Sequence, residues 1–170
     1  MEFSDWITAQ VQAHEAALCR YAFSLCGNEA LAKDAVQETF LRLCRAERGK
    51  VEGHEAAWLF KVCRSRVIDL QRKAKPMQTL TPRHEAVLPD PARTPYESAL
   101  HRDAADPLPA MMARLTDRQR EALRLKFQED MSYRDIAGVM NLTEGNVGFI
   151  LHTALKTLGK QMKQLEGVPA

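Results

Sequence analysis

The sequence predicts an all-α protein: two small helical domains joined by a Pro-rich linker, the C-terminal one a helix-turn-helix. Three observations support this fold class. Apolar residues recur at helical spacing in both halves of the chain, no segment alternates like a strand, and seven of the eight prolines lie in one central window. The 170 residues, 45% of them hydrophobic, suffice to bury a core in one medium domain or in two small ones.

The helical periodicity divides into six segments, at residues 6–25, 30–43, 57–70, 118–127, 133–140 and 144–158. Gly27 and Asn28 separate the first two segments, since both residues tolerate the left-handed conformation that ends helices.

Start signals precede the last three segments. Thr116 with Gln119 forms a capping box, Ser132 with Asp135 approximates one, and Thr143 is placed to cap the final helix. These signals predict where each C-terminal helix begins.

The prolines divide the chain into residues 1–75, a linker at 76–110, and residues 111–170, because their density forbids a continuous helix through the linker. The three parts carry 12 basic and 10 acidic, 3 and 5, and 9 and 7 residues, so two domains of net +2 flank a linker of net −2. The acidic linker is either a passive spacer or a segment that occupies a cationic channel in a partner.

Composition also bears on compartment and chemistry. No apolar run is long enough to span a bilayer and the N-terminus is acidic where a signal peptide is basic, so we expect a cytoplasmic protein without membrane insertion. The four cysteines lack CxxC spacing, as is ordinary for thiols in a reducing compartment. We expect no metal and no cofactor, since His14, Cys19 and Cys26 fit no common ligand pattern.

The segment 57–73 combines positive charge with an aromatic residue. A helical wheel places Leu59, Val62, Cys63, Val67 and Leu70 on one face, and Trp58, Lys61, Arg64, Ser65, Ile68 and Arg72 on or near the other. Residues 61–75 include six cations and one acid. An aromatic ring beside cations is suited to stack an unpaired base while the cations hold its backbone, so nucleic-acid binding is favoured over a merely solvated basic face.

The segment 132–151 has the pattern of a helix-turn-helix. Its inward positions are Ile136, Ala137, Met140, Leu142, Val147 and Leu151, and Asn141 stands in the turn where glycine is common. The second helix is expected to bury Val147, Ile150, Leu151, Ala154 and Leu158, and to present Asn146, Phe149, His152, Thr153 and Lys156 to a major groove. Lys156 is the only full cation on that face. Asn146 suits adenine, and Phe149 suits either a thymine methyl group or a protein partner.

Taken together, these blocks resemble the extracytoplasmic-function (group IV) sigma factors of the bacterial sigma-70 family. YAFSLCGNEALAKDAVQETFLRL resembles the family's polymerase-binding helices, AWLFKVCRSRVIDLQRK its −10 melting helix, and LTDRQREALRLKFQEDMSYRDIAGVMNLTEGNV its −35 domain. The resemblance implies a factor that directs core RNA polymerase to promoters and promotes −10 melting during transcription initiation. It also implies an anti-sigma factor as a further partner.

The resemblance implies roles for particular residues. The surface that docks core polymerase would be formed or supported by Asp34, Gln37, Glu38, Phe40, Leu41 and Arg42. The −10 strand would lie along Trp58, Lys61, Arg64, Ser65, Arg72 and Lys73, and the −35 duplex near Arg134 and the outer face of the last helix from Glu144 to Lys156.

The chain departs from the family's pattern in two places. Ser65 stands where the family often has Asn, and Gly148, Phe149, Ile150, Thr153 and Leu155 stand where its −35 helix usually carries several Lys or Arg residues. The second departure predicts weak or unusual binding of the upstream element.

Two other readings remain open at the level of sequence: a stand-alone helix-turn-helix transcriptional regulator, and a sigma-like protein that acts by binding an anti-sigma factor or another partner. The first leaves DAVQETFLRL unexplained. An enzyme is not expected, because the sequence lacks a Gly-rich phosphate loop, a nucleophile elbow and a metal cluster.

Overall fold

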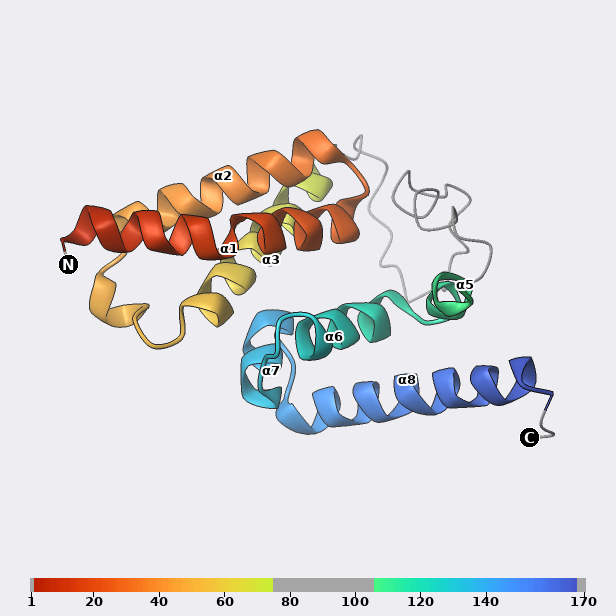
Figure 1. The fold of residues 1–170 in the computed structure, drawn as a ribbon. Coiled ribbons are helices and arrows are strands. Elements are labelled where there is room, and N and C mark those ends of the chain that lie inside the picture. Colours follow the sequence, from red (N-terminus) through yellow and green to blue (C-terminus); the bar gives the residue numbers. More distant parts are fainter. Residues whose placement is uncertain (1, 75–105, 168–170) are drawn as a thin grey trace.

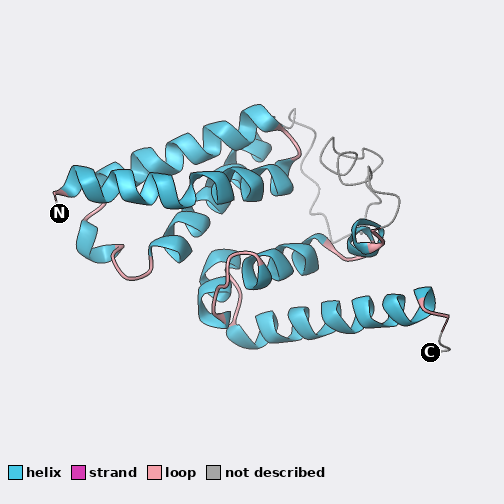
Figure 2. Cartoon of the chain, in the orientation of Figure 1, coloured by secondary structure: helices cyan, strands magenta, loops and turns pink. Residues whose placement is uncertain are grey.

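The computed structural model describes residues 2–74 and 106–167, and within these ranges every regular element is helical (Figure 2). The N-terminal domain consists of α1 (Phe3–Cys26), α2 (Glu29–Arg45), a 3-10 turn (Arg48–Lys50) and α3 (Glu55–Ala74). The C-terminal domain consists of α5 (Leu108–Ala113), α6 (Asp117–Phe127), α7 (Tyr133–Met140) and α8 (Glu144–Leu165). The all-α prediction and the six predicted helices are confirmed, although α8 runs seven residues beyond 158.

The helix α5 begins within the last residues of the range predicted as linker. Pro109 lies in the first turn of this helix, where a missing N–H costs no hydrogen bond, so the proline does not prevent a helix at that point. Most of the predicted linker lies outside the described residues.

The junction of α1 and α2 lies at Gly27 and Asn28, as predicted, but the two residues act differently. Gly27 adopts the left-handed conformation with φ 64° and ends α1 as expected. Asn28 does not: its backbone is extended, and its side chain accepts a hydrogen bond from the Leu31 N–H, so it caps the start of α2. The predicted break between the helices at Gly27 and Asn28 is therefore confirmed, and only the left-handed conformation expected of Asn28 was wrong.

The predicted caps of the C-terminal domain are confirmed. Thr116 and Gln119 form a reciprocal capping box at α6, and the side chains of Ser132 and Thr143 accept hydrogen bonds at the starts of α7 and α8. Asn141 ends α7 in the left-handed conformation with φ 56°. The helix-turn-helix therefore has the local geometry that its sequence predicts.

The two domains pack against each other. In the N-terminal domain, α1, α2 and α3 contact one another along their lengths, and α7 of the C-terminal domain packs against α3 (Figure 1). Helix α2 lies on the far side of α1 and α3 from the C-terminal helices. Buried residues of both domains join in one hydrophobic cluster, so α3 has a neighbour on two sides.

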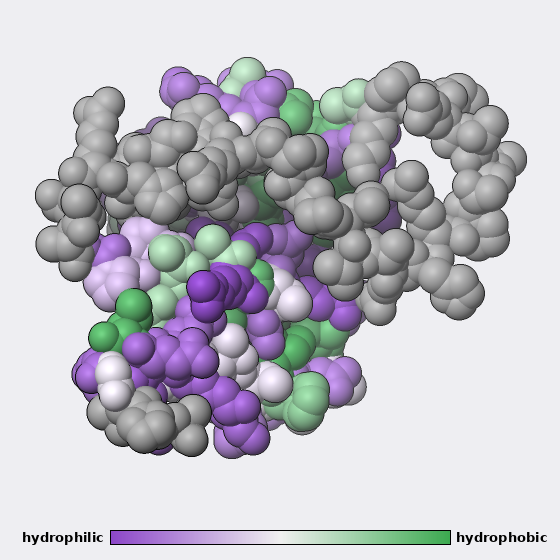
Figure 3. Space-filling view, turned by 90° about the vertical axis from the view of Figure 1, so that its right-hand side faces the viewer, coloured by the Kyte–Doolittle hydropathy of each residue, from purple (hydrophilic) through white to green (hydrophobic). Residues whose placement is uncertain are grey.

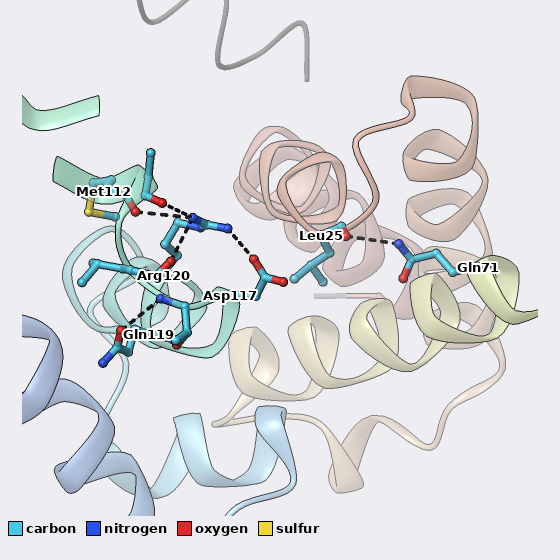
Figure 4. Close-up of polar contacts among 9 residues, drawn as sticks. Leu25, Gln71, Met112, Asp117, Gln119 and Arg120 are labelled. Carbon is cyan, nitrogen blue, oxygen red and sulfur yellow. Dashed lines mark hydrogen bonds and ion pairs between the residues drawn. The ribbon is translucent and has the colours of Figure 1, made fainter. Parts of the chain in front are cut away.

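Polar contacts brace each domain near its edge (Figure 4). The Arg120 guanidinium donates hydrogen bonds to the carbonyl groups of Met112, Ala113 and Leu115 and pairs with Asp117, which fixes the turn between α5 and α6. The Gln71 amide donates to the Leu25 carbonyl across 3.2 Å and ties the end of α3 to the end of α1. Each domain therefore has internal support for its own helix arrangement.

Candidate functional site

The basic face of α3 is open along most of its length. Lys61, Ser65, Arg72 and Lys73 are exposed. Trp58 is half-buried and packs its ring against the hydrophobic core, so only part of that ring is accessible to a base. Apart from Arg64, the predicted DNA-binding side chains of this helix thus lie at or near the surface.

Arg64 was predicted to lie on the outward face, but it is half-buried between the domains. Its Nε donates to Oε1 of Glu121 on α6 across 2.8 Å, and its Nη2 lies 3.5 Å from Oε2. Tyr21 on α1 donates its hydroxyl to the same Oε1 across 2.7 Å. We call these three residues, Tyr21, Arg64 and Glu121, the interdomain triad.

Phe60 shows why the helical wheel was incomplete. Its side chain is fully buried, and its ring centroid lies 4.9 Å from that of Tyr21. Of the residues predicted to face inward, Leu59, Cys63 and Val67 are buried, whereas Val62 and Leu70 are half-buried. Ile68, predicted to face outward, is also half-buried, because α3 packs on a second side against the C-terminal domain.

Burial and charge shift the pKa values of the interdomain triad. Burial first, and then the neighbouring Glu121 carboxylate, raise the pKa of the Tyr21 hydroxyl well above its ordinary value, so the phenol stays neutral and keeps the proton with which it donates a hydrogen bond to Glu121. Burial alone would lower the pKa of Arg64, but the hydrogen bond and charge of Glu121 outweigh it and leave that pKa raised. The guanidinium therefore stays charged in the seam between the domains.

The outer face of α8 is open as well. Asn146, Phe149, His152 and Lys156 are exposed, with Phe149 70% exposed. Thr153 is half-buried, and its hydroxyl donates back to the Phe149 carbonyl. That hydrogen bond occupies the Thr153 proton, so this residue is less suited to reading a base than the other four.

The remaining helix-turn-helix predictions divide by burial. Ile136, Ala137, Met140, Val147, Leu151 and Ala154 are buried as expected, and Leu142, Ile150 and Leu158 are half-buried. Arg134 is exposed on α7.

In Figure 3, hydrophobic residues lie scattered among hydrophilic ones on the described part of the face shown.

The predicted polymerase-binding surface lies on the outer side of α2. Asp34, Gln37 and Leu41 form an exposed stripe at helical spacing. Beside it, Arg42 Nε lies 3.3 Å from Oε1 of Glu38, which stands one helical turn earlier. Phe40 is half-buried against the core and supports the stripe from behind. Helix α2 contacts α1 and α3, and this stripe is open to solvent while the domains are packed together.

The cysteines and histidines are not arranged to hold a metal ion in the part of the chain that the structure describes. No group of three potential metal ligands, His14 with Cys19 and Cys26 included, comes together there. Burial raises the pKa of the Cys63 thiol to about 12, which keeps it protonated and unreactive at neutral pH. No described helix has both the length and the apolarity needed to cross a membrane.

Sequence reasoning missed Tyr21 and Glu121, which join the domains, and Phe60, which packs beside Tyr21. A weak signal was present at Glu121, which directly precedes Ala122 and Leu123, and all three residues are buried. The partners of Glu121 are 57 and 100 residues away, so no local pattern could identify them.

Comparison with known proteins gives two family matches. Residues 10–76 match the sigma-70 region 2 family, and residues 105–158 match sigma-70, region 4. The first match contains α2 and α3, and the second contains the helix-turn-helix.

Individual relatives agree with these matches. The ECF RNA polymerase sigma factor SigL of Mycobacterium tuberculosis (strain H37Rv) is 32% identical over 161 residues, which cover 89% of this chain and 86% of SigL. The ECF RNA polymerase sigma factor SigM of Bacillus subtilis (strain 168) is 29% identical over 140 residues, which cover 82% and 84% of the two chains.

A solved structure shares the fold. It is the sigma factor RpoE from Bartonella quintana in complex with the anti-sigma factor NepR, and it aligns with a TM-score of 0.60 at 20% identity over 92% of this chain and 96% of that one.

Proposed function

The chain belongs to the ECF sigma factors of bacterial RNA polymerase, which direct core polymerase to promoters, and we propose that its three surfaces divide this work by residue. The observation that carries the proposal is the order of the parts. An exposed acidic and amide stripe on α2, a basic helix α3 and a helix-turn-helix follow one another within the two matched regions.

The first surface, on α2, docks core polymerase. Asp34 and Gln37 supply an acid and an amide for a basic partner, Leu41 supplies apolar contact, and the Glu38–Arg42 pair borders them. Phe40 supports this surface by packing beneath it.

The second surface binds the −10 strand. Lys61, Arg72 and Lys73 hold phosphates, Trp58 offers the accessible part of its ring to a base, and Ser65 offers a hydroxyl between them. Arg64 joins this surface when its guanidinium is not held by Glu121.

The third surface meets the −35 duplex through α8 and Arg134. Asn146 is suited to adenine and Phe149 to a thymine methyl group, while Lys156 and Arg134 supply the charge. His152 and Thr153 lie beside them on the same helix. With so few cations, this surface contributes less affinity than α3 does.

The chemistry of RNA synthesis stays with the polymerase, so the chain acts as a binding and positioning subunit in the cytoplasm and not as an enzyme. An anti-sigma factor is a further partner of this proposal. It is supported by the complex of the Bartonella protein with its anti-sigma factor and by exposed apolar residues such as Phe149.

Run-off transcription with purified bacterial core polymerase tests the proposal. The wild-type chain is expected to co-purify with core polymerase and to give defined starts from genomic fragments. A variant carrying Asp34→Ala and Gln37→Ala is expected to lose both activities. The matched control carries Gln12→Ala and Glu15→Ala, which remove an amide and an acid from the exposed face of α1.

Three contrary results are distinguishable. Core binding without initiation would favour a sigma-like binding partner, and absence of core binding would favour a stand-alone regulator. Equal loss in the α1 control would show that the α2 stripe is not the docking surface.

A further inference from the structure

The interdomain triad joins three helices of two domains at one carboxylate. Tyr21 comes from α1, Arg64 from α3 and Glu121 from α6. Glu121 is 5% exposed and is the one Asp, Glu, Lys or Arg buried to this degree among the described residues. Its side-chain hydrogen bonds in that part of the chain come from Tyr21 and Arg64, both in the other domain.

This arrangement makes the charge balance of Glu121 depend on domain packing. A carboxylate inside a single domain is ordinarily satisfied by groups of that domain, because leaving it unpaired is costly. Glu121 instead receives its two donors from α1 and α3. When the domains separate, all three side chains return to water, so the pairing is made and broken together with the seam.

The energetics of such a pair suit a reversible contact. Coulomb attraction between buried charges is largely offset by the loss of their hydration, so a buried ion pair adds little net stability to the packed state. The Arg64 side chain is also 22% exposed, and water therefore has a route to the pair.

A second pair of opposite charges lies at the edge of the seam. Arg20 and Glu129 line a small hollow together with Tyr21, Arg124 and Gln128, which come from both domains. Burial raises the pKa of the Glu129 carboxyl, and the nearby Arg20 charge partly opposes that shift. Charged groups therefore face one another across the seam beyond the interdomain triad, with Arg124 beside Glu129 in the same hollow.

The seam covers one proposed binding residue and leaves others open. Carboxylate and phosphate both accept hydrogen bonds from a guanidinium, so Glu121 occupies the group with which Arg64 would hold a DNA phosphate. The stripe of Asp34, Gln37 and Leu41 on α2 stays exposed in the same arrangement.

We propose that Glu121 is an intramolecular competitor of DNA for Arg64, and that with Tyr21 it forms a latch that sets the balance between a closed and an open arrangement of the two domains. This inference rests on the proposed role of Arg64 at the −10 strand. Closing the latch pairs the Arg64 guanidinium with Glu121 and half-buries it, whereas opening it releases the guanidinium and leaves the polymerase-docking stripe unchanged.

The test compares full-length variants of nearly identical shape. Glu121→Gln removes the charge but keeps a hydrogen-bond acceptor, and Tyr21→Phe removes one donor while keeping the ring. Glu29→Gln is the matched control: it removes a carboxylate that pairs with Lys33 across 2.7 Å on the exposed start of α2, so it changes the net charge equally.

Two quantities are measured on each free chain. Small-angle X-ray scattering reports the radius of gyration, and fluorescence anisotropy reports affinity for a single-stranded oligonucleotide of −10 sequence. If the open form is about one molecule in ten, releasing the latch raises apparent affinity by up to about ten-fold. We expect Glu121→Gln to expand the chain and bind more tightly than Glu29→Gln, with Tyr21→Phe in between.

Three results would overturn the latch. One is an unchanged radius of gyration in Glu121→Gln, and another is expansion with no gain in affinity beyond that of Glu29→Gln. The third is an equal gain for Glu121→Gln when Arg64→Ala is added, since the gain must depend on Arg64. Circular dichroism of each variant separates opening from unfolding.

Failure of the proposed function looks different. In that case wild type with core polymerase gives no defined starts in run-off transcription, whatever the free variants do. With the latch present, Glu121→Gln and wild type give the same run-off starts, because docking on α2 is unaltered.

Discussion

The two helices proposed to bind promoter DNA, α3 and α8, differ in their charge and in how far the other domain covers their side chains. Residues 61–75 carry six cations and one acid, whereas the outer face of α8 carries Lys156 as its full cation. Yet Arg64 of α3 is held by Glu121 in the other domain, while Phe149 of α8 is 70% exposed. The comparison shows that α3, the helix with most of the charge, has one of its cations held by the other domain, whereas α8 is open but offers few cations to phosphates.

The largest effect is expected on stability, at Phe60 of α3. Phe60→Ala should lower the free energy of unfolding by about 3–5 kcal/mol, because the fully buried ring leaves a cavity beside Tyr21. Urea unfolding followed by circular dichroism measures this. Phe127→Ala, at a ring that is 64% exposed, is the control, and a loss below about 1 kcal/mol for Phe60→Ala would contradict the packing described.

The next largest effect is on promoter affinity, which substitutions on α3 should reduce more than a substitution on α8. Arg72→Ala, and Arg64→Ala in the holoenzyme, should each weaken promoter binding by about 1–2 kcal/mol, and Lys156→Ala by less. Losing one phosphate contact should also reduce the salt dependence of the affinity by about one unit of log–log slope. A titration in which Lys156→Ala causes an equal or larger loss would reverse the assignment.

A smaller effect is expected at the start of α8, which Thr143 caps through the Asn146 N–H. Thr143→Ala should lower the free energy of unfolding by about 1 kcal/mol, since it leaves that N–H without its side-chain acceptor. Thr143→Ser keeps the hydroxyl and should restore the stability. Thermal unfolding of the pair measures the difference, and equal values would show that the cap is not formed in solution.

The smallest change in stability is expected at Phe149. Because its ring is exposed, Phe149→Ala should alter the free energy of unfolding by no more than about 0.5 kcal/mol. Promoter binding then separates two roles. If Phe149→Ala weakens binding only to promoters with a thymine at one −35 position, the ring contacts a base. If transcription is unchanged and anti-sigma binding is weakened, the ring contacts a protein.

The sequence was sufficient for features that depend on neighbouring residues. The helices, the caps at Thr116, Ser132 and Thr143, and the left-handed Asn141 follow from spacing within a few positions. For the candidate site, the predicted outward positions Lys61, Arg72 and Phe149 are exposed. Their roles in binding stay predictions.

Features that depend on distant residues could not be predicted in this way. Helical periodicity identifies one side of α3, but Arg64 lies against Glu121, 57 residues along the chain, and Phe60 packs beside Tyr21 of α1. The conformation of Asn28 was misjudged because an asparagine can end one helix with a left-handed backbone or cap the next helix with its side chain. The start of α5 was not predicted, because a count of prolines does not distinguish a proline in the first turn of a helix from one in a helix interior.

The separation of 57 residues between Arg64 and Glu121 also has a consequence during protein synthesis. Ribosomes add about 5–20 residues per second, so roughly 3–11 s pass between the addition of Arg64 and that of Glu121. Contacts among α1, α2 and α3 are local enough to form in that interval. A nascent chain therefore displays Arg64 without its Glu121 partner, and the first folded form of this protein in its lifetime is the unlatched one.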